Sequence, residues 1–124
     1  MMKPAKDAQL VLVVEDDAAT AEALSELLRL RGYRSVVSRN GQEALDRLRS
    51  GARPCLILLD IMMPVKNGWD VRDELLSDRD LAAIPVVVVT ADMTAMARAT
   101  SLRLPLLTKP VDPANLIATV EHYC

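Results

Sequence analysis

The feature that most constrains the fold is an apolar run at residues 55–59, which ends abruptly at the carboxylate of Asp60. A run without polar alternation is typical of a strand that is buried on both of its faces. Such strands occur mainly in parallel sheets whose two faces are covered by helices. Asn67-Gly68 then supplies a turn signal before a helical pattern begins. The run therefore predicts a central strand of an α/β domain.

The rest of the chain alternates further strand patterns with amphipathic helical patterns. The other predicted strands are residues 9–14, 33–38, 86–90 and 104–107. Apolar residues at helical spacing follow the first, second, third and fifth strands, whereas the pattern at residues 92–100 is weak. Asn40 and the pair Asp112-Pro113 are signals for helix N-termini. Five strand–helix units predict a three-layer (βα)₅ domain with a doubly wound parallel sheet.

Length and composition limit the class of protein. The chain has 124 residues and a net charge of −2, and its Lys and Arg residues are scattered. It lacks the basic footprint of a nucleic-acid-binding protein, and no apolar run approaches the length of a membrane span. No secretory signal follows Met1, so we expect a cytoplasmic protein. We expect residues 1–8 to form a tail and residues 9–124 to form one domain. Cys55 and Cys124 lack metal-site spacing, and we expect both to be reduced thiols.

Polar residues gather at the ends of four predicted strands. They are Glu15, Asp16 and Asp17 after the first strand, Asp60 after the third, Thr90 at the end of the fourth, and Thr108 and Lys109 after the fifth. Singly, each has an ordinary explanation as a helix cap, a turn residue or a solvated lysine. In a parallel sheet, however, these strand ends share one edge, and carboxylates can hold Mg²⁺ there. Beside a lysine and a hydroxyl, Asp60 could act as a nucleophile that forms an aspartyl phosphate.

Four motifs, taken in order, give the chain a resemblance to a known family. They are VVEDD at 13–17, LLDIMMPVKNG at 58–68, VVVVTA at 86–91 and LLTKP at 106–110. The ordered set covers nearly the whole chain and resembles the receiver domains of response regulators in two-component signalling, including single-domain chemotaxis regulators. The resemblance implies a flavodoxin-like fold with strand order 2-1-3-4-5.

The resemblance also implies a phosphoacceptor and a metal site. Asp60 matches the phosphoacceptor, and Glu15 and Asp16 match the acidic pocket that binds Mg²⁺, with Mn²⁺ as a possible substitute. The backbone carbonyl of Met62 would supply a further metal ligand. Because the Met62 side chain is bulky and apolar, we expect it to shield the phosphoryl group from water and to slow self-dephosphorylation.

Further positions match the residues that bind and sense the phosphoryl group in this family. Thr90 matches the switch hydroxyl, and Lys109 matches the lysine that pairs with the phosphoryl group. The small residue Ala91 would leave the site open to a phosphodonor, and the bond before Pro110 is expected to be cis. Leu106 occupies the position where the family commonly has an aromatic residue, so an aromatic switch cannot operate here.

The implied function is a phosphorylation switch rather than an enzyme that acts on other substrates. A sensor histidine kinase or a histidine phosphotransfer protein would donate the phosphoryl group. A downstream protein target would then recognise the face formed by the helix at 92–100, the strand at 104–107 and the closing helix. We expect a monomer or a weak dimer, with no nucleic-acid or membrane contact by this domain. A free-standing regulator and a receiver cut from a longer chain both remain open.

The sequence departs from the family's pattern at two places, and two other functions are alternatives. The segment between Thr90 and Lys109 is a few residues shorter than usual, and Ser101-Leu102-Arg103 replaces the usual Gly-Ala. We therefore expect a short or irregular helix at 92–100 and an altered output face. A phosphatase with an aspartate nucleophile would usually carry a second acid at the position of Met62. A degenerate receiver that only binds proteins would lack an acid, the Thr or the Lys, yet all are present.

Overall fold

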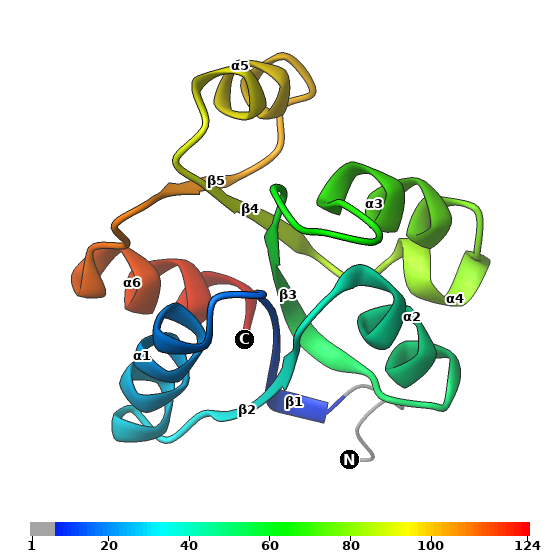
Figure 1. Cartoon of the computed structure of the whole chain (residues 1–124). Helices are drawn as coiled ribbons and strands as arrows, with labels where there is room; N and C mark the ends of the chain where they lie inside the picture. Colours follow the sequence, from blue (N-terminus) through cyan, green and yellow to red (C-terminus); the bar gives the residue numbers. More distant parts are fainter. Residues whose placement is uncertain (1–6) are drawn as a thin grey trace.

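The predicted apolar runs form five parallel strands between two layers of helices (Figure 1). The structure is a computed structural model that describes residues 7–124, so residues 1–6 of the predicted tail lie outside the described part. The strands are Asp7–Val14 (β1), Arg34–Ser38 (β2), Pro54–Asp60 (β3), Val86–Thr90 (β4) and Leu106–Thr108 (β5). The helices are Ala18–Leu30 (α1), Gly41–Arg49 (α2), Gly68–Leu76 (α3), Arg79–Ala82 (α4), Met93–Ser101 (α5) and Pro113–Tyr123 (α6).

The sheet has the order β2-β1-β3-β4-β5, and each neighbouring pair is parallel. Strand β3 lies in the middle, and all seven of its residues are buried. Because every strand runs in the same direction, the carboxyl ends of the strands meet at one edge of the sheet. The predicted fold class and strand order are confirmed.

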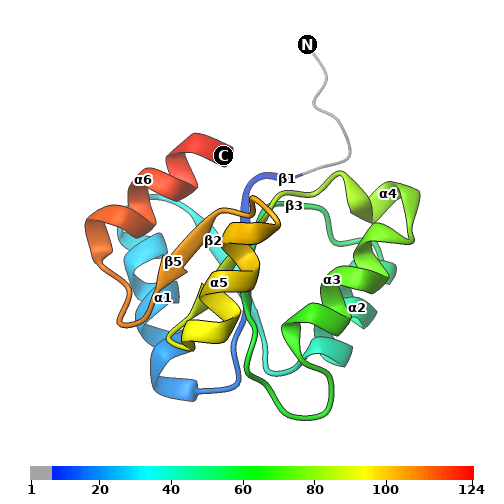
Figure 2. The same cartoon turned by 90° about the horizontal axis from the view of Figure 1, so that it is seen from above.

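Two apolar cores, one on each face of the sheet, hold the layers together. Helices α1 and α6 cover one face, and α2, α3, α4 and α5 contribute to the core on the other (Figure 2). Side chains along β3 alternate between these cores, with Ile57 and Leu59 on one face and Leu56 and Leu58 on the other. A strand that serves both cores has no polar positions, which explains the continuous apolar run.

Each helix within residues 7–124 begins after an Asp or Asn whose side chain accepts a backbone N–H of the first turn. These N-cap residues are Asp17, Asn40, Asn67, Asp78, Asp92 and Asp112. An N-cap of this kind typically contributes about 1 kcal/mol to stability. The N-cap roles predicted for Asn40 and Asp112 are confirmed.

Some element boundaries differ from the predictions. Strand β1 begins at Asp7, so the predicted domain start at residue 9 falls inside this strand. Strand β5 begins at Leu106 rather than at residue 104, since Pro105 has no N–H to donate to the sheet. The short helix α4 is an addition that its cap, Asp78, and its buried residue, Leu81, make possible.

The helix at 92–100 is predicted to be short or irregular; α5 is regular, so the irregular alternative was wrong, but it is shorter than α1 and α6. It has nine residues, the same length as α2 and α3, and its N-cap is Asp92. Its buried residues are only Ala95 and Ala99, and two small side chains explain the weak amphipathic pattern. Arg103 then adopts a φ of 58°, in the segment where the family usually has Gly-Ala.

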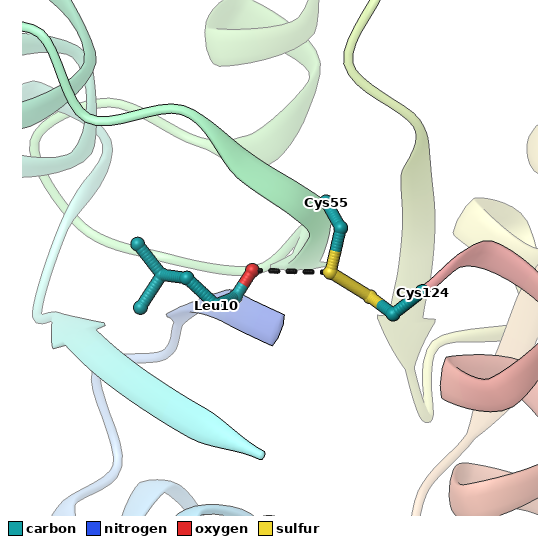
Figure 3. The surroundings of a disulfide bond; sticks show 3 residues. All are labelled: Leu10, Cys55 and Cys124. Atoms are coloured by element: carbon teal, nitrogen blue, oxygen red, sulfur yellow. Dashed lines mark hydrogen bonds between the residues drawn. A yellow bond between two sulfur atoms is a disulfide. The ribbon is translucent and has the colours of Figure 1, made fainter. Parts of the chain in front are cut away.

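The prediction of reduced thiols was also wrong, because Cys55 and Cys124 form a disulfide (Figure 3). Cys55 lies near the start of β3, and Cys124 follows the last residue of α6. Packing of α6 against the sheet brings their Cα atoms to 5.5 Å, within the range for a disulfide. The residues are 69 positions apart, so sequence spacing gave no sign of the pairing.

Among the helices of residues 7–124, none is both long and apolar enough to cross a membrane.

Candidate functional site

The polar residues predicted to share one edge of the sheet do meet there. Glu15 directly follows β1, Asp60 ends β3 and Thr90 ends β4, and all three are buried. Lys109 directly follows β5, and its N–H donates to the Thr90 carbonyl oxygen at 3.0 Å. Parallel pairing thus brings residues from four distant segments to one place.

Three carboxylates form an acidic cluster at this edge. Glu15, Asp16 and Asp60 each offer an oxygen, and these atoms all lie within 4.8 Å of one another. Asp16 is exposed, whereas the other two carboxylates are buried. Asp17, the third acid of the VVEDD motif, is not part of this cluster. Its side chain accepts the Thr20 N–H and caps α1.

Burial and charge perturb the pKa of Asp60. Burial and the neighbouring Glu15 carboxylate raise the pKa of Asp60 to about 7, although the Lys109 ammonium opposes the change. Because burial and Glu15 disfavour the ionised form of Asp60, a cation bound beside this carboxylate would stabilise that form. The clustered oxygens are hard ligands of the type that Mg²⁺ prefers.

Lys109 contacts two members of the cluster. Its Nζ lies 2.7 Å from Glu15 Oε1 and 3.4 Å from Asp60 Oδ1. Burial alone would lower the pKa of the Lys109 ammonium, but hydrogen bonding and the two carboxylate charges raise it. Despite this close ion pair, the buried Glu15 Oε1 has no well-aligned hydrogen bond among the described residues. This oxygen can therefore accept a further cationic partner, which fits a metal ion.

Thr90 connects the site to helix α5. Its Oγ1 accepts the backbone N–H of Asp92 at 3.0 Å, and Asp92 in turn accepts the Ala95 N–H at 2.8 Å. The hydroxyl and the start of α5 therefore share one hydrogen-bonded chain. Ala91, between Thr90 and Asp92, is exposed, and the Lys109–Pro110 bond is cis, as the resemblance implies.

The loop that follows Asp60 is held tightly against the end of β3. The Ile61 carbonyl oxygen accepts N–H groups from both Met63 and Gly68. A Cβ atom at Gly68 would lie 2.7 Å from the Asp60 carbonyl oxygen, so only glycine fits there. The predicted turn residue thus also fixes the backbone of the predicted phosphoacceptor.

A groove beside the cluster includes residues that sequence analysis did not assign to function. It has a volume of about 530 Å³ and lies between the loop after β3 and the start of α5. Met62, a residue that is 61% exposed, lines it together with Trp69 and Arg98. The Arg98 guanidinium lies 4.3 Å from the Trp69 ring centroid and joins α5 to α3. No local pattern links residues so far apart.

Leu106, the predicted non-aromatic switch position, packs partly buried against an apolar core.

Comparisons with known proteins agree with this geometry. The family described as "Response regulator receiver domain" matches residues 11–121. The chain is 37% identical over 116 residues to the DNA-binding response regulator MtrA of Mycobacterium tuberculosis H37Rv, an alignment that covers 91% of this chain and 49% of MtrA. The chain thus spans about half the length of the curated relatives it matches.

Solved receiver domains have the same fold. The receiver domain of a signal transduction histidine kinase from Syntrophus aciditrophicus matches with a TM-score of 0.82 and 33% identity, over 93% of this chain and 89% of that one. The receiver domain of the sensor histidine kinase PA1611 from Pseudomonas aeruginosa PAO1 matches with a TM-score of 0.81 and 26% identity, over 93% and 96%. That structure has a magnesium ion coordinated in its active-site cleft. The chain described here belongs to the response regulator receiver domains of two-component signalling.

Proposed function

We propose that Asp60 is the phosphoacceptor of this receiver domain. The observation that carries this proposal is the placement of a buried carboxylate at the end of β3, between two other acids and a lysine. The donor would be a phosphohistidine on a sensor histidine kinase or on a histidine phosphotransfer protein. One Asp60 carboxylate oxygen attacks phosphorus, the new P–O bond forms, and the P–N bond to the donor imidazole breaks.

We propose that Glu15, Asp16, Asp60 and the Met62 backbone carbonyl hold a Mg²⁺ ion, for which Mn²⁺ could substitute. The clustered oxygens support this assignment, as does the buried Glu15 Oε1, which has an ion pair with Lys109 but no well-aligned hydrogen bond. A bound divalent cation would neutralise charge on the phosphoryl oxygens during transfer. The magnesium ion reported in the PA1611 receiver domain is consistent with the proposed metal.

Lys109 and Thr90 would stabilise the product. Lys109 Nζ already lies 3.4 Å from Asp60 Oδ1, so its ammonium can pair with a phosphoryl oxygen attached there. The Thr90 hydroxyl can donate a hydrogen bond to another phosphoryl oxygen. Ala91 is small and exposed, which leaves room for the donor to approach. These groups bind and orient the phosphoryl group, so the domain acts on its own phosphorylation state and needs no other substrate.

Transmission to the surface would begin at Thr90. When its hydroxyl turns toward the phosphoryl group, it gives up the hydrogen bond from the Asp92 N–H. Asp92 caps α5, so this change bears directly on the start of that helix. The proposed output face consists of α5, β5 and α6, with Leu106 in place of an aromatic switch. A target reads the switch only if it binds one arrangement of this face better than the other.

The proposed partners are a cytoplasmic histidine-containing phosphodonor and a downstream protein, with the domain itself monomeric or weakly dimeric. The curated relative MtrA is named as DNA-binding, and it is about twice as long as this chain. We assign no nucleic-acid contact to the residues of this domain, whose net charge is −2.

The test is phosphorylation by acetyl phosphate and Mg²⁺, followed by intact-mass measurement. We expect one phosphoryl adduct in the wild type, none in Asp60→Asn and none after removal of the metal with EDTA. Asp17→Asn is the matched control, because Asp17 is a neighbouring acid outside the cluster and an Asn can still cap α1. An adduct that persists in Asp60→Asn would contradict the assignment. No adduct from acetyl phosphate or from a phosphohistidine protein would favour a phosphorylation-independent interaction module.

A further inference from the structure

A second chemically active pair of residues lies at the opposite edge of the sheet from Asp60. Cys55 is near the amino end of β3, the same strand that ends in Asp60, and its partner Cys124 follows α6. Figure 3 shows the disulfide between the start of the strand and the end of the helix. We propose that Cys55 and Cys124 form a redox-sensitive modification site that exchanges with low-molecular-weight thiols and disulfides.

The two cysteine residues differ in exposure, which gives exchange a direction. Cys55 is only 1% exposed, whereas Cys124 is partly exposed. A thiolate in solution would therefore attack the Cys124 sulfur and form a mixed disulfide, with Cys55 as the leaving thiolate. A second thiolate would then release Cys124 and complete the reduction.

The surroundings of Cys55 also accommodate the reduced state. Its Sγ lies 3.3 Å from the Leu10 carbonyl oxygen, within hydrogen-bond distance for sulfur (Figure 3). A disulfide sulfur has no hydrogen to donate, so this contact becomes a hydrogen bond only when Cys55 is a thiol. The register between β1 and β3 shifts between Asp7 and Val11, which is the segment that contains Leu10. The fold thus offers a partner to the buried sulfur in the reduced form.

The redox state of this pair decides how firmly the end of α6 is attached to the sheet. Buried residues Leu116, Ile117 and Val120 anchor the body of the helix. Beyond them, the disulfide joins Cys124 covalently to Cys55 of β3. The Cys124 N–H also donates a hydrogen bond to the Val120 carbonyl oxygen. Reduction removes the covalent attachment and frees the last turn. Since α6 is part of the proposed output face, oxidation would restrict that face, and this consequence rests on the proposed function.

The oxidation step balances with a disulfide of the glutathione type as oxidant. The two cysteine thiols lose two electrons and two protons and gain one S–S bond. The oxidant accepts the same electrons and protons, loses its S–S bond and leaves as two thiols. Reduction by a dithiol is the reverse reaction.

The experiment equilibrates the folded full chain in glutathione buffers of varied ratio, then traps free thiols with iodoacetamide and counts alkyl adducts by mass. We expect complete conversion between no adduct and two adducts without denaturant. We expect the oxidised form to melt roughly 10 °C higher than the reduced form. Hydrogen exchange at residues 120–124 should be faster after reduction. Neither Cys124→Ser nor Cys55→Ala can form the intramolecular disulfide, so Cys124→Ser should match the reduced form at every buffer ratio, and Cys55→Ala should gain at most a mixed disulfide with glutathione at Cys124.

Two results would overturn the proposal. One is a pair that converts only in denaturant, because the site would then be a structural disulfide or an inert pair of thiols. The other is a reversible pair whose reduction leaves hydrogen exchange in α6 unchanged. Acetyl phosphate labelling of Asp60 in both redox forms separates this proposal from the proposed function, since labelling needs neither cysteine.

Discussion

At the scale of single residues, the site depends on a carboxylate that the fold makes difficult to ionise. Asp60 is buried beside Glu15, and its pKa is raised to about 7 in the metal-free chain. An unfolded chain would ionise this group near its ordinary value of 3.8. The folded state therefore holds a proton that the unfolded state has lost between these two values. Ionisation of Asp60 at neutral pH therefore lowers the free energy of unfolding when no cation is bound, and a bound cation offsets this loss.

This argument gives a pH-dependent prediction for metal-free protein. The stability of the wild type should fall relative to Asp60→Asn as the pH rises from about 4 to about 7. By pH 8 the variant should be more stable by roughly 2–4 kcal/mol, whereas at pH 4 the two should be about equal. Urea denaturation in EDTA at a series of pH values measures the difference. Asp17→Asn is the control, because its stability should change with pH in the opposite direction relative to the wild type. Hydrogen bonds from Thr20 lower the pKa of Asp17, so the stabilisation by its carboxylate is lost only at acidic pH. Parallel curves for wild type and Asp60→Asn would disprove the explanation.

A second residue-scale prediction concerns the close contact at Gly68. A methyl group there would press on the Asp60 carbonyl oxygen and on Ile61. We expect Gly68→Ala to destabilise the fold by about 1–3 kcal/mol and to slow acetyl phosphate labelling of Asp60. Gly32→Ala is the control, since Gly32 has a φ of 86° and open space around it, in the turn between α1 and β2. It should lose about 1 kcal/mol with unchanged labelling. Equal labelling rates in the two variants would contradict the proposed contact.

At the scale of elements, α5 is the part of the fold most directly joined to the site. Its cap residue, Asp92, is hydrogen-bonded to Thr90, and its outer residue Arg98 stacks on Trp69 of α3. Only two alanines anchor the helix in the core, so little buried area resists its movement. Trp69, the single tryptophan of the chain, therefore serves as a natural probe of the position of α5.

Loss of the α5 cap should separate phosphorylation from the response of the helix. Asp92→Ala keeps the backbone N–H that meets Thr90 but removes the side chain that accepts the Ala95 N–H. We expect a loss of about 1 kcal/mol, near-normal acetyl phosphate labelling and a smaller change in Trp69 fluorescence on labelling. Asp112→Ala removes an equivalent cap from α6 and should leave the Trp69 response intact. A full Trp69 response in Asp92→Ala would rule out the proposed link.

At the scale of the whole molecule, the features that sequence predicted are those that local patterns determine. Apolar runs and helix caps locate the elements, and parallel strands gather Glu15, Asp60, Thr90 and Lys109 at one edge. The resemblance supplied the strand order. The disulfide, the Trp69–Arg98 contact and the groove beside it depend on residues that only folding brings together. The short segment between Thr90 and Lys109 indicates an irregular helix, yet the Asp92 cap and the buried residues Ala95 and Ala99 give a regular α5.

A bound cation should stabilise the whole molecule, because the acidic cluster is assembled only when the segment after β1 meets the end of β3 in the folded sheet. A ligand that binds the native state alone raises stability with its concentration, by about 2.7 kcal/mol at 100 times the dissociation constant. We therefore expect Mg²⁺ to raise the melting temperature progressively at pH 8, where Asp60 is ionised. Asp16→Asn should weaken this effect, whereas Asp17→Asn should preserve it, since only Asp16 belongs to the cluster. Thermal denaturation with Mg²⁺ and with matched NaCl separates binding from ionic strength. If both salts raise the melting temperature equally, the cluster does not act as a metal site.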